Sequence, residues 1–272
     1  METLEENYEA LKTALIGYGR VGVAFSGGVD STLLLKVAHD VLGGNAVALT
    51  AAQRSVPGFE MKEAADFCAA EGIRHIVCTI NELAVDAFVR NPPDRCYYCK
   101  KNVLSNIGRA AAELGITHIL EGTNADDLGD FRPGRRAIEE YGALSPLLDA
   151  GLTKAEIRTL SERLGLPTWD KPSYACLASR IARGEPITED KLRMIEVAEG
   201  FLMARGIRQM RVRVHGDLAR IEALPESIAK IAEPDFREAL TKKFKALGFR
   251  YISLDLEGYK TGSMNPHGAA AG

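Results

Sequence analysis

Six residues near the N-terminus, Ser26-Gly-Gly-Val-Asp-Ser31, have the types and spacing of a site that handles phosphate. Ser26, Gly27 and Gly28 leave backbone N–H groups bare at the start of a helix, where they and the positive helix end favour an anion. Asp30 would repel a bare phosphate, so its carboxylate indicates a magnesium ion between the two. The alternative is a tight turn that needs glycine for its dihedral angles. No Gly-Lys-[Ser/Thr] follows at the Walker A spacing, which excludes that loop type.

A second polar segment, 121–137, places Asp126, Asp127 and Asp130 shortly after Gly122. A solvated loop rich in turn residues would have the same composition. Its expected place at the same sheet edge as the first loop favours a role in ligand binding. Asp126 is therefore the alternative to the aspartate of the first loop as a magnesium ligand.

Cysteines supply a third kind of chemistry. We interpret Cys68 and Cys78, which lie in apolar patterns, as small buried residues. Cys96, Cys99 and Cys176 lie in polar contexts that look like loops, and in a reducing compartment they are not expected to form disulfides. A thiolate is an intrinsically strong nucleophile, and the Lys, Ser and Arg neighbours of Cys176 argue against a place in an apolar core.

These residues need a framework, and the first half of the chain alternates strand and helix patterns. We expect buried strands at 21–25, 46–50, 75–79 and 117–120, and helices that begin near residues 31, 57, 82 and 100. This alternation predicts a parallel sheet covered by helices on both faces. Ligands bind such sheets beyond the carboxyl ends of the strands, which is where both polar loops lie.

The organisation changes around Gly184, where we place a domain boundary. Before it, Thr153 and Glu156 form a capping box for a helix that Gly165 ends. After it, helices at 188–204 and 234–247 and strands at 210–214, 219–223 and 251–254 predict a small α+β unit. The expected domains are 1–184 and 185–264, and residues 265–272 are expected to be a disordered tail.

Composition limits the function classes. The 272 residues are 46% hydrophobic and 26% charged, with a net charge of −3, as in an ordinary globular protein. That charge argues against a nucleic-acid partner, although Arg208, Arg211, Arg213 and Arg220 form a local basic cluster. No apolar run reaches the length of a membrane span, and the acidic N-terminus resembles no targeting peptide. We expect a cytoplasmic homo-oligomer with a small-molecule nucleotide as its partner.

With these residues assembled, the chain resembles the ATP pyrophosphatase, or PP-loop, superfamily, whose signature is the SGGVDS at 26–31. Within it, KPSYACLASRIARGEPIT after EGTNADD, together with MRVRVHGDLARIE, resembles the LarE family of sulfurtransferases, which make the nickel-pincer nucleotide cofactor of lactate racemase. The resemblance covers residues 8–265. It implies an α/β fold of the adenine nucleotide alpha hydrolase type, with a smaller C-terminal α+β domain.

The resemblance also implies a reaction. ATP is split to AMP and pyrophosphate, a carboxylate of pyridinium-3,5-dicarboxylic acid mononucleotide is adenylated, and sulfur converts it to a thiocarboxylate. Amides of the 26–31 loop would hold the pyrophosphate, and the backbone around Thr50 and Gly122 would meet adenine and ribose. Cys176 would attack the acyl-adenylate, with its thiolate stabilised by Lys171, Arg180 and Arg183.

Two arginines at period two on one strand, Arg211 and Arg213, suit the phosphate of the substrate. The alternative is a charged outer face on an edge strand.

The pair Cys96 and Cys99 bears on the source of the sulfur. In one branch of the family the cysteine that matches Cys176 gives up its own sulfur and becomes dehydroalanine. In another, three cysteines hold a [4Fe-4S] cluster whose open iron carries sulfide, which the pair plus Cys176 would allow. A redox pair, a zinc site with a fourth ligand and spare loop cysteines remain alternatives.

Two other classes of function compete. A tRNA thiolase would need a basic RNA-binding module, and an ammonia-using ligase of the NAD synthase type would leave Cys176 without a role. A nucleotide-binding or Fe–S scaffold without catalysis would release no pyrophosphate.

Overall fold

The computed structural model describes residues 3–129, 133–172 and 174–260. The chain forms two compact units: Met1–Glu82 with Cys96–Ser173, and Leu83–Arg95 with Tyr174–Gly272. Residues 83–95 and 174–184, which a boundary at Gly184 assigns to the first domain, thus belong to the second unit. The expected tail at 265–272 lies outside the described residues, and the sequence-based domain boundary stays a prediction.

A parallel sheet in the order β3-β2-β1-β4 forms the centre of the first unit. Its strands are β1 (Val21–Ala24), β2 (Ala46–Ala52), β3 (Arg74–Thr79) and β4 (His118–Leu120). Val21 of β1 is in register with Ala46 of β2 and with His118 of β4, so the carboxyl ends of these strands meet at one edge. The chain leaves β1 towards β2 on one side and adds β4 on the other. Such a reversal of strand order opens a crevice for ligands at that edge.

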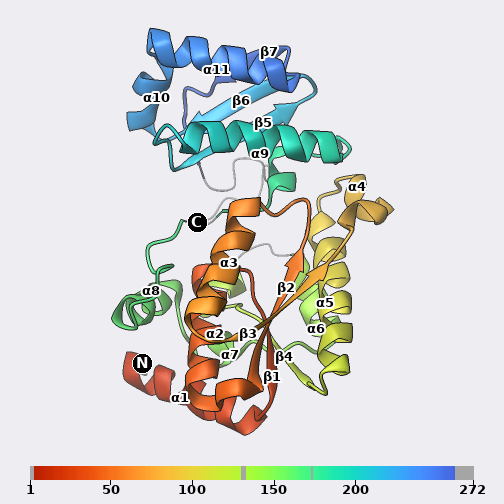
Figure 1. Cartoon of the computed structure of the whole chain (residues 1–272), viewed down its shortest axis with the longest axis vertical. Helices are drawn as coiled ribbons and strands as arrows, with labels where there is room; N and C mark the ends of the chain where they lie inside the picture. Colours follow the sequence, from red (N-terminus) through yellow and green to blue (C-terminus); the bar gives the residue numbers. More distant parts are fainter. Residues whose placement is uncertain (1–2, 130–132, 173, 261–272) are drawn as a thin grey trace. The chain divides into compact units, whose positions relative to one another are not determined.

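Helices cover both faces of this sheet, as the sequence predicts (Figure 1). They are α1 (Leu4–Tyr18), α2 (Val29–Leu42), α3 (Gly58–Ala70), α5 (Arg95–Glu113), α6 (Gly134–Tyr141), α7 (Pro146–Asp149) and α8 (Lys154–Arg163), with 3-10 segments η1 (Gly43–Asn45), η2 (Glu82–Ala84) and η3 (Ala125–Gly129). Along β2 the faces alternate: Ala46 and Ala48 pack with α1 and α2, whereas Val47 and Leu49 pack with α5 and α6. This alternation is the period of a strand buried on both sides.

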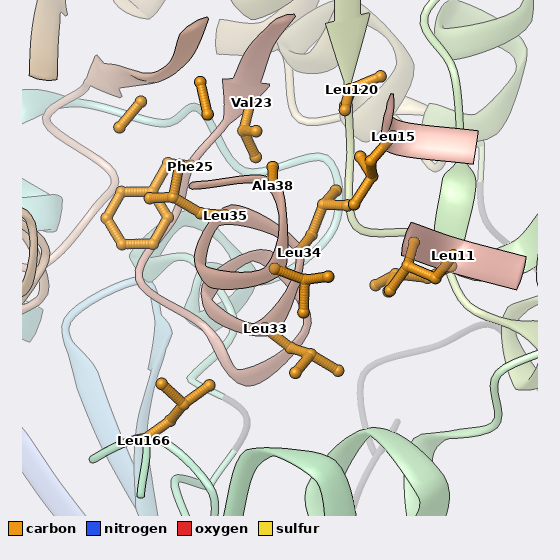
Figure 2. Close-up of a cluster of buried hydrophobic side chains, with 14 of the residues drawn as sticks. Leu11, Leu15, Val23, Phe25, Leu33, Leu34, Leu35, Ala38, Leu120 and Leu166 are labelled. Atoms are coloured by element: carbon orange, nitrogen blue, oxygen red, sulfur yellow. The ribbon is translucent and has the colours of Figure 1, made fainter. Parts of the chain in front are cut away.

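The helix that follows the first polar loop is buried almost all round. Leu33, Leu34 and Leu35 of α2 have no exposed surface, and Leu11 and Leu15 of α1 lie in the same cluster (Figure 2). A helix that is apolar on every side belongs in the interior of a layered fold. The loop at 26–31 is therefore attached to a rigid central element.

The second unit is a small α+β assembly, as expected. Its sheet has the order β5-β6-β7, with β5 antiparallel and β7 parallel to β6. The elements are β5 (Met210–His215), β6 (Leu218–Ala223), β7 (Tyr251–Leu254), α4 (Asp86–Val89), α9 (Glu189–Met203), α10 (Pro225–Ala232), α11 (Pro234–Leu247) and η4 (Leu177–Arg180). Among all the helices that the structure describes, none is both long enough and apolar enough to cross a membrane.

Candidate functional site

The loop between β1 and α2 folds back on the first turn of its own helix. The hydroxyl oxygens of Ser26 and Ser31 lie 3.0 Å apart, and the Ser31 hydroxyl donates to the Gly28 carbonyl oxygen at 3.2 Å. Gly27 has φ +70°, and a Cβ there would lie 3.3 Å from that of Ala64, so glycine is needed for both conformation and space. The geometry is that of an anion cradle at a helix N-terminus.

Gly122, directly after β4, brings the second loop against the first. A Cβ at Gly122 would lie 3.2 Å from both the Asp30 Cβ and the Ser31 nitrogen, closer than a side chain normally approaches. The next polar group, Glu121, is buried and accepts hydrogen bonds from the backbone and hydroxyl of Thr123 and from Ser145. The two loops therefore meet in direct contact at the carboxyl edge of the sheet.

A cavity of about 410 Å³ opens where these loops meet. It brings together four of the predicted site residues, Ser26, Asp30, Ser31 and Gly122. Its wall also contains Cys96, Lys100, Asp127 and Arg135, which come from α5, η3 and α6. Lys100 and Arg135 were not predicted from the sequence, because cations at a helix start look like solvated surface.

Two predicted residues lie elsewhere in this unit. Asp126 is exposed and accepts a hydrogen bond from the Lys154 backbone N–H at 2.8 Å, whereas its neighbour Asp127 lines the cavity. Thr50 is buried in β2, where its hydroxyl donates to the Phe25 carbonyl oxygen at 2.8 Å and lies 2.8 Å from His75 Nε2. Thr50 thus supports the start of the phosphate loop from within the sheet. Asp130 lies outside the described residues.

Cys96 and Cys99 lie in the first turn of α5 and not in a loop, which corrects the expected start of that helix near residue 100. Cys96 is exposed and lines the cavity, and Gln53 Nε2 lies 3.5 Å from the Cys99 sulfur. The spacing i, i+3 places both thiols on one side of the helix. Neither unit gathers three or more described His, Cys, Asp or Glu side chains in an arrangement that could hold a metal ion.

Cys176 belongs to the second unit, where it is half-buried and directly precedes η4. Arg180 is buried and forms an ion pair with Glu199 at 2.9 Å. Its Nη1 also donates to the carbonyl oxygens of Ala175 and Cys176, the latter at 3.0 Å. Arg180 therefore holds the backbone of the Cys176 turn, and the structure describes no contact of its guanidinium with the thiol.

The other two cations expected beside Cys176 also have partners elsewhere. Lys171 belongs to the first unit, where its ammonium donates to the Gly27 carbonyl oxygen at 2.9 Å and to Glu63 at 2.7 Å. Arg183 donates to the carbonyl oxygens of Pro92 and Pro93 at 2.9 Å. Lys171 thus contacts the phosphate loop, a position that its distance in sequence had concealed.

Arg211 and Arg213 are buried in β5, so the alternative of a solvated strand face is wrong. Arg213 pairs with Glu222 at 2.7 Å, and the Arg211 guanidinium lies 4.9 Å from the centre of the Tyr259 ring. Burial lowers the pKa of Arg211, and the nearby charge of Arg180 lowers it further. A cation that is desolvated beside another cation gains from a bound anion.

Comparison with known proteins gives two full-length relatives. The chain is 39% identical over 267 residues, 97% of this chain and 96% of the relative, to pyridinium-3,5-bisthiocarboxylic acid mononucleotide synthase of Lactiplantibacillus plantarum. It is 43% identical over 262 residues, 96% of this chain and 98% of the relative, to an uncharacterized protein of Synechocystis sp.. It is also 29% identical over 197 residues, 65% of this chain and 61% of the relative, to a glutamine-hydrolyzing GMP synthase of Thermoplasma volcanium. No family model matches the chain.

Proposed function

The chain belongs to the LarE family of pyridinium-3,5-bisthiocarboxylic acid mononucleotide synthases, and from this premise we propose that it is an ATP-dependent sulfurtransferase of the PP-loop superfamily. In this reaction a carboxylate of pyridinium-3,5-dicarboxylic acid mononucleotide attacks the α-phosphorus of ATP and releases pyrophosphate. Sulfur then displaces AMP from the acyl carbon and leaves a thiocarboxylate. The main support is the cavity that joins the 26–31 loop, Gly122 and Cys96.

The residues of this cavity suit ATP with magnesium. N–H groups of the first turn of α2 would hold the departing pyrophosphate, because they have no partner within the helix. The carboxylates of Asp30 and Asp127 and the hydroxyls of Ser26 and Ser31 are oxygen donors, the ligands that magnesium prefers. Bound there, magnesium would neutralise charge on the phosphates. We propose the backbone around Gly122 and Thr50 as the contact for ribose and adenine.

The proposed roles in the second unit rest on its buried arginines. Arg211 and Arg213 would bind the phosphate of the mononucleotide, because a buried guanidinium retains little water and forms strong bonds to an anion. Cys176 would act on the acyl-adenylate, with Arg180 as the residue that positions its turn.

Replacement of Arg211 or Arg213 by alanine is expected to weaken binding of the mononucleotide far more than binding of ATP. Each variant loses a charge-assisted contact of roughly 1.5–3 kcal/mol. Calorimetric titration with each ligand measures the difference. Arg193→Ala, which removes an exposed arginine of α9 that pairs with Asp190, is the matched control and should leave both affinities unchanged. A loss confined to ATP affinity would show that the pocket is wrongly assigned.

Two sources of sulfur are compatible with the chain, and we propose the second. In the first, Cys176 gives up its own sulfur. In the second, Cys96, Cys99 and Cys176 ligate a [4Fe-4S] cluster, which when bound would supply sulfide at an iron that the protein leaves open. Its support is the pair of thiols one turn apart on α5, one of which lines the cavity.

The proposed function is tested by incubating the purified protein with labelled ATP, magnesium and the dicarboxylic acid mononucleotide. We expect AMP and pyrophosphate in equal amounts, formed only when the acceptor is present. A non-catalytic nucleotide-binding protein would form neither product, and an ammonia ligase would require ammonia. The cytoplasmic location, the homo-oligomer and the lack of a nucleic-acid or membrane partner stay predictions.

A further inference from the structure

Lys154, which has no predicted role from the sequence, contacts the acidic side of the cavity. Its ammonium forms an ion pair with Asp30 Oδ2, and the other oxygen of that carboxylate accepts from Asn124 Nδ2 at 3.1 Å. The side chain of Lys154 is 35% exposed and that of Asp30 is 22% exposed, so both are partly shielded from water. The carboxylate proposed as a magnesium ligand therefore already has a cation beside it.

The position of this ammonium is fixed by the fold. Lys154 is the first residue of α8, whose capping box joins Thr153 and Glu156. The backbone N–H of Lys154 donates to Asp126, and the N–H of Ala125 donates to the Leu152 carbonyl oxygen at 2.9 Å, so α8 begins directly against the second loop. Ile157 and Leu160 of α8 are buried in the same core cluster as α2. A group held on a packed helix start is placed more reproducibly than one on a loop.

We propose that Lys154 is a catalytic residue that exchanges its partner during the reaction, an inference that rests on the proposed ATP site. In the protein without nucleotide, its ammonium neutralises Asp30. When magnesium and ATP enter, magnesium takes the Asp30 carboxylate, and the ammonium moves to a phosphate oxygen because two cations at one carboxylate repel each other. A flexible stem with a compact charge suits such a change of partner.

In this role Lys154 binds the leaving group and transfers no proton. The substrate carboxylate oxygen forms a bond to the α-phosphorus, the bond from that phosphorus to the bridging oxygen breaks, and the electron pair leaves with pyrophosphate. Charge therefore accumulates on pyrophosphate, where a fixed ammonium stabilises the transition state more than the ground state. The exchange predicts opposite effects on two equilibria: Lys154 should oppose metal binding in the free protein and favour binding of pyrophosphate.

The test uses Lys154→Met with two probes that do not depend on turnover. Manganese alone, followed by electron paramagnetic resonance, should bind the variant about tenfold more tightly than wild type, because a competing charge is gone. Magnesium pyrophosphate, followed by calorimetry, should bind about tenfold or more weakly. If either affinity equals that of wild type, the exchange does not occur.

Two further variants separate charge from structure. Lys154→Arg keeps the charge and should retain wild-type manganese affinity; a shift as large as that of Lys154→Met would overturn the proposal. Lys36→Met removes a partly buried lysine of α2 that pairs with Asp40 and Glu71, so it is the matched control and should change neither affinity. Failure of wild type to form AMP would contradict the proposed function, whereas the two affinities of Lys154→Met judge this inference separately.

Discussion

Asp30→Asn is expected to lower the rate of AMP formation at least about 100-fold while the protein stays folded. The amide is nearly isosteric with the carboxylate, so the start of α2 and its packing under the loop remain. What disappears is the negative charge that we propose holds magnesium across the phosphates. Single-turnover release of labelled pyrophosphate measures the effect.

Asp40→Asn is the matched control for this variant. Asp40 lies in the same helix, is more exposed and pairs with Lys36 at 2.7 Å, away from the cavity. Its exposed pair contributes only about 0.3–0.5 kcal/mol, so activity and melting temperature should remain close to wild type. Undiminished pyrophosphate release by Asp30→Asn would remove Asp30 from the mechanism.

The second prediction concerns the sulfur. If Cys96, Cys99 and Cys176 ligate a cluster, turnover will require iron reconstitution and added sulfide, and serine at any one of the three positions will stop it. The intact mass of the protein will not change. If Cys176 is sacrificial, its thiolate attacks the acyl carbon, its Cβ–Sγ bond then breaks with loss of the Cα proton, and the chain becomes about 34 Da lighter. In that case Cys96→Ser and Cys99→Ser will barely affect a single turnover.

Mass spectrometry after reaction with ATP and substrate, with and without sulfide, distinguishes these outcomes. We expect the cluster result, and an anaerobic absorption spectrum with iron and sulfide analysis should agree with it. Cys78→Ala is the matched control, because burial raises the pKa of the half-buried Cys78 thiol and its strand lies away from the cavity wall. Burial raises the pKa of Cys68 to about 11, so that thiol stays protonated and is a poor donor. Dehydroalanine at position 176 in a reconstituted anaerobic sample would contradict the cluster.

The sheet and its loops could be predicted because their signals are local. A short apolar strand, two glycines and a helical repeat of leucines lie within residues 21–42, and β2 and β3 show the same contrast with their neighbours. The short helices α6, α7 and α10 were missed, because each begins at or beside a proline or glycine that reads as a turn. The early start of α5 was missed because polar residues at 95–101 hide Tyr97, which packs with Leu104 and Ile107.

The side-chain partners in the site could not be predicted, because they are distant in sequence. Arg213 is buried since Glu222 neutralises it from the neighbouring strand, and without that strand a charged residue at period two looks exposed. Lys154 lies 124 residues from the carboxylate that it contacts. Periodicity identifies which face of an element is buried, but not which charge on another element meets it.

The close approach at Gly122 gives a practical criterion for judging other chains that contain the Ser-Gly-Gly-Val-Asp-Ser loop. Even one methyl group at this position would press on Asp30 and Ser31, so it would separate the phosphate loop from the loop after β4. Such a chain could keep its sheet and its buried helix and still lose the geometry for adenylation. We would therefore use the residue at this position, before any assay, to sort active homologues from those that retain only the scaffold.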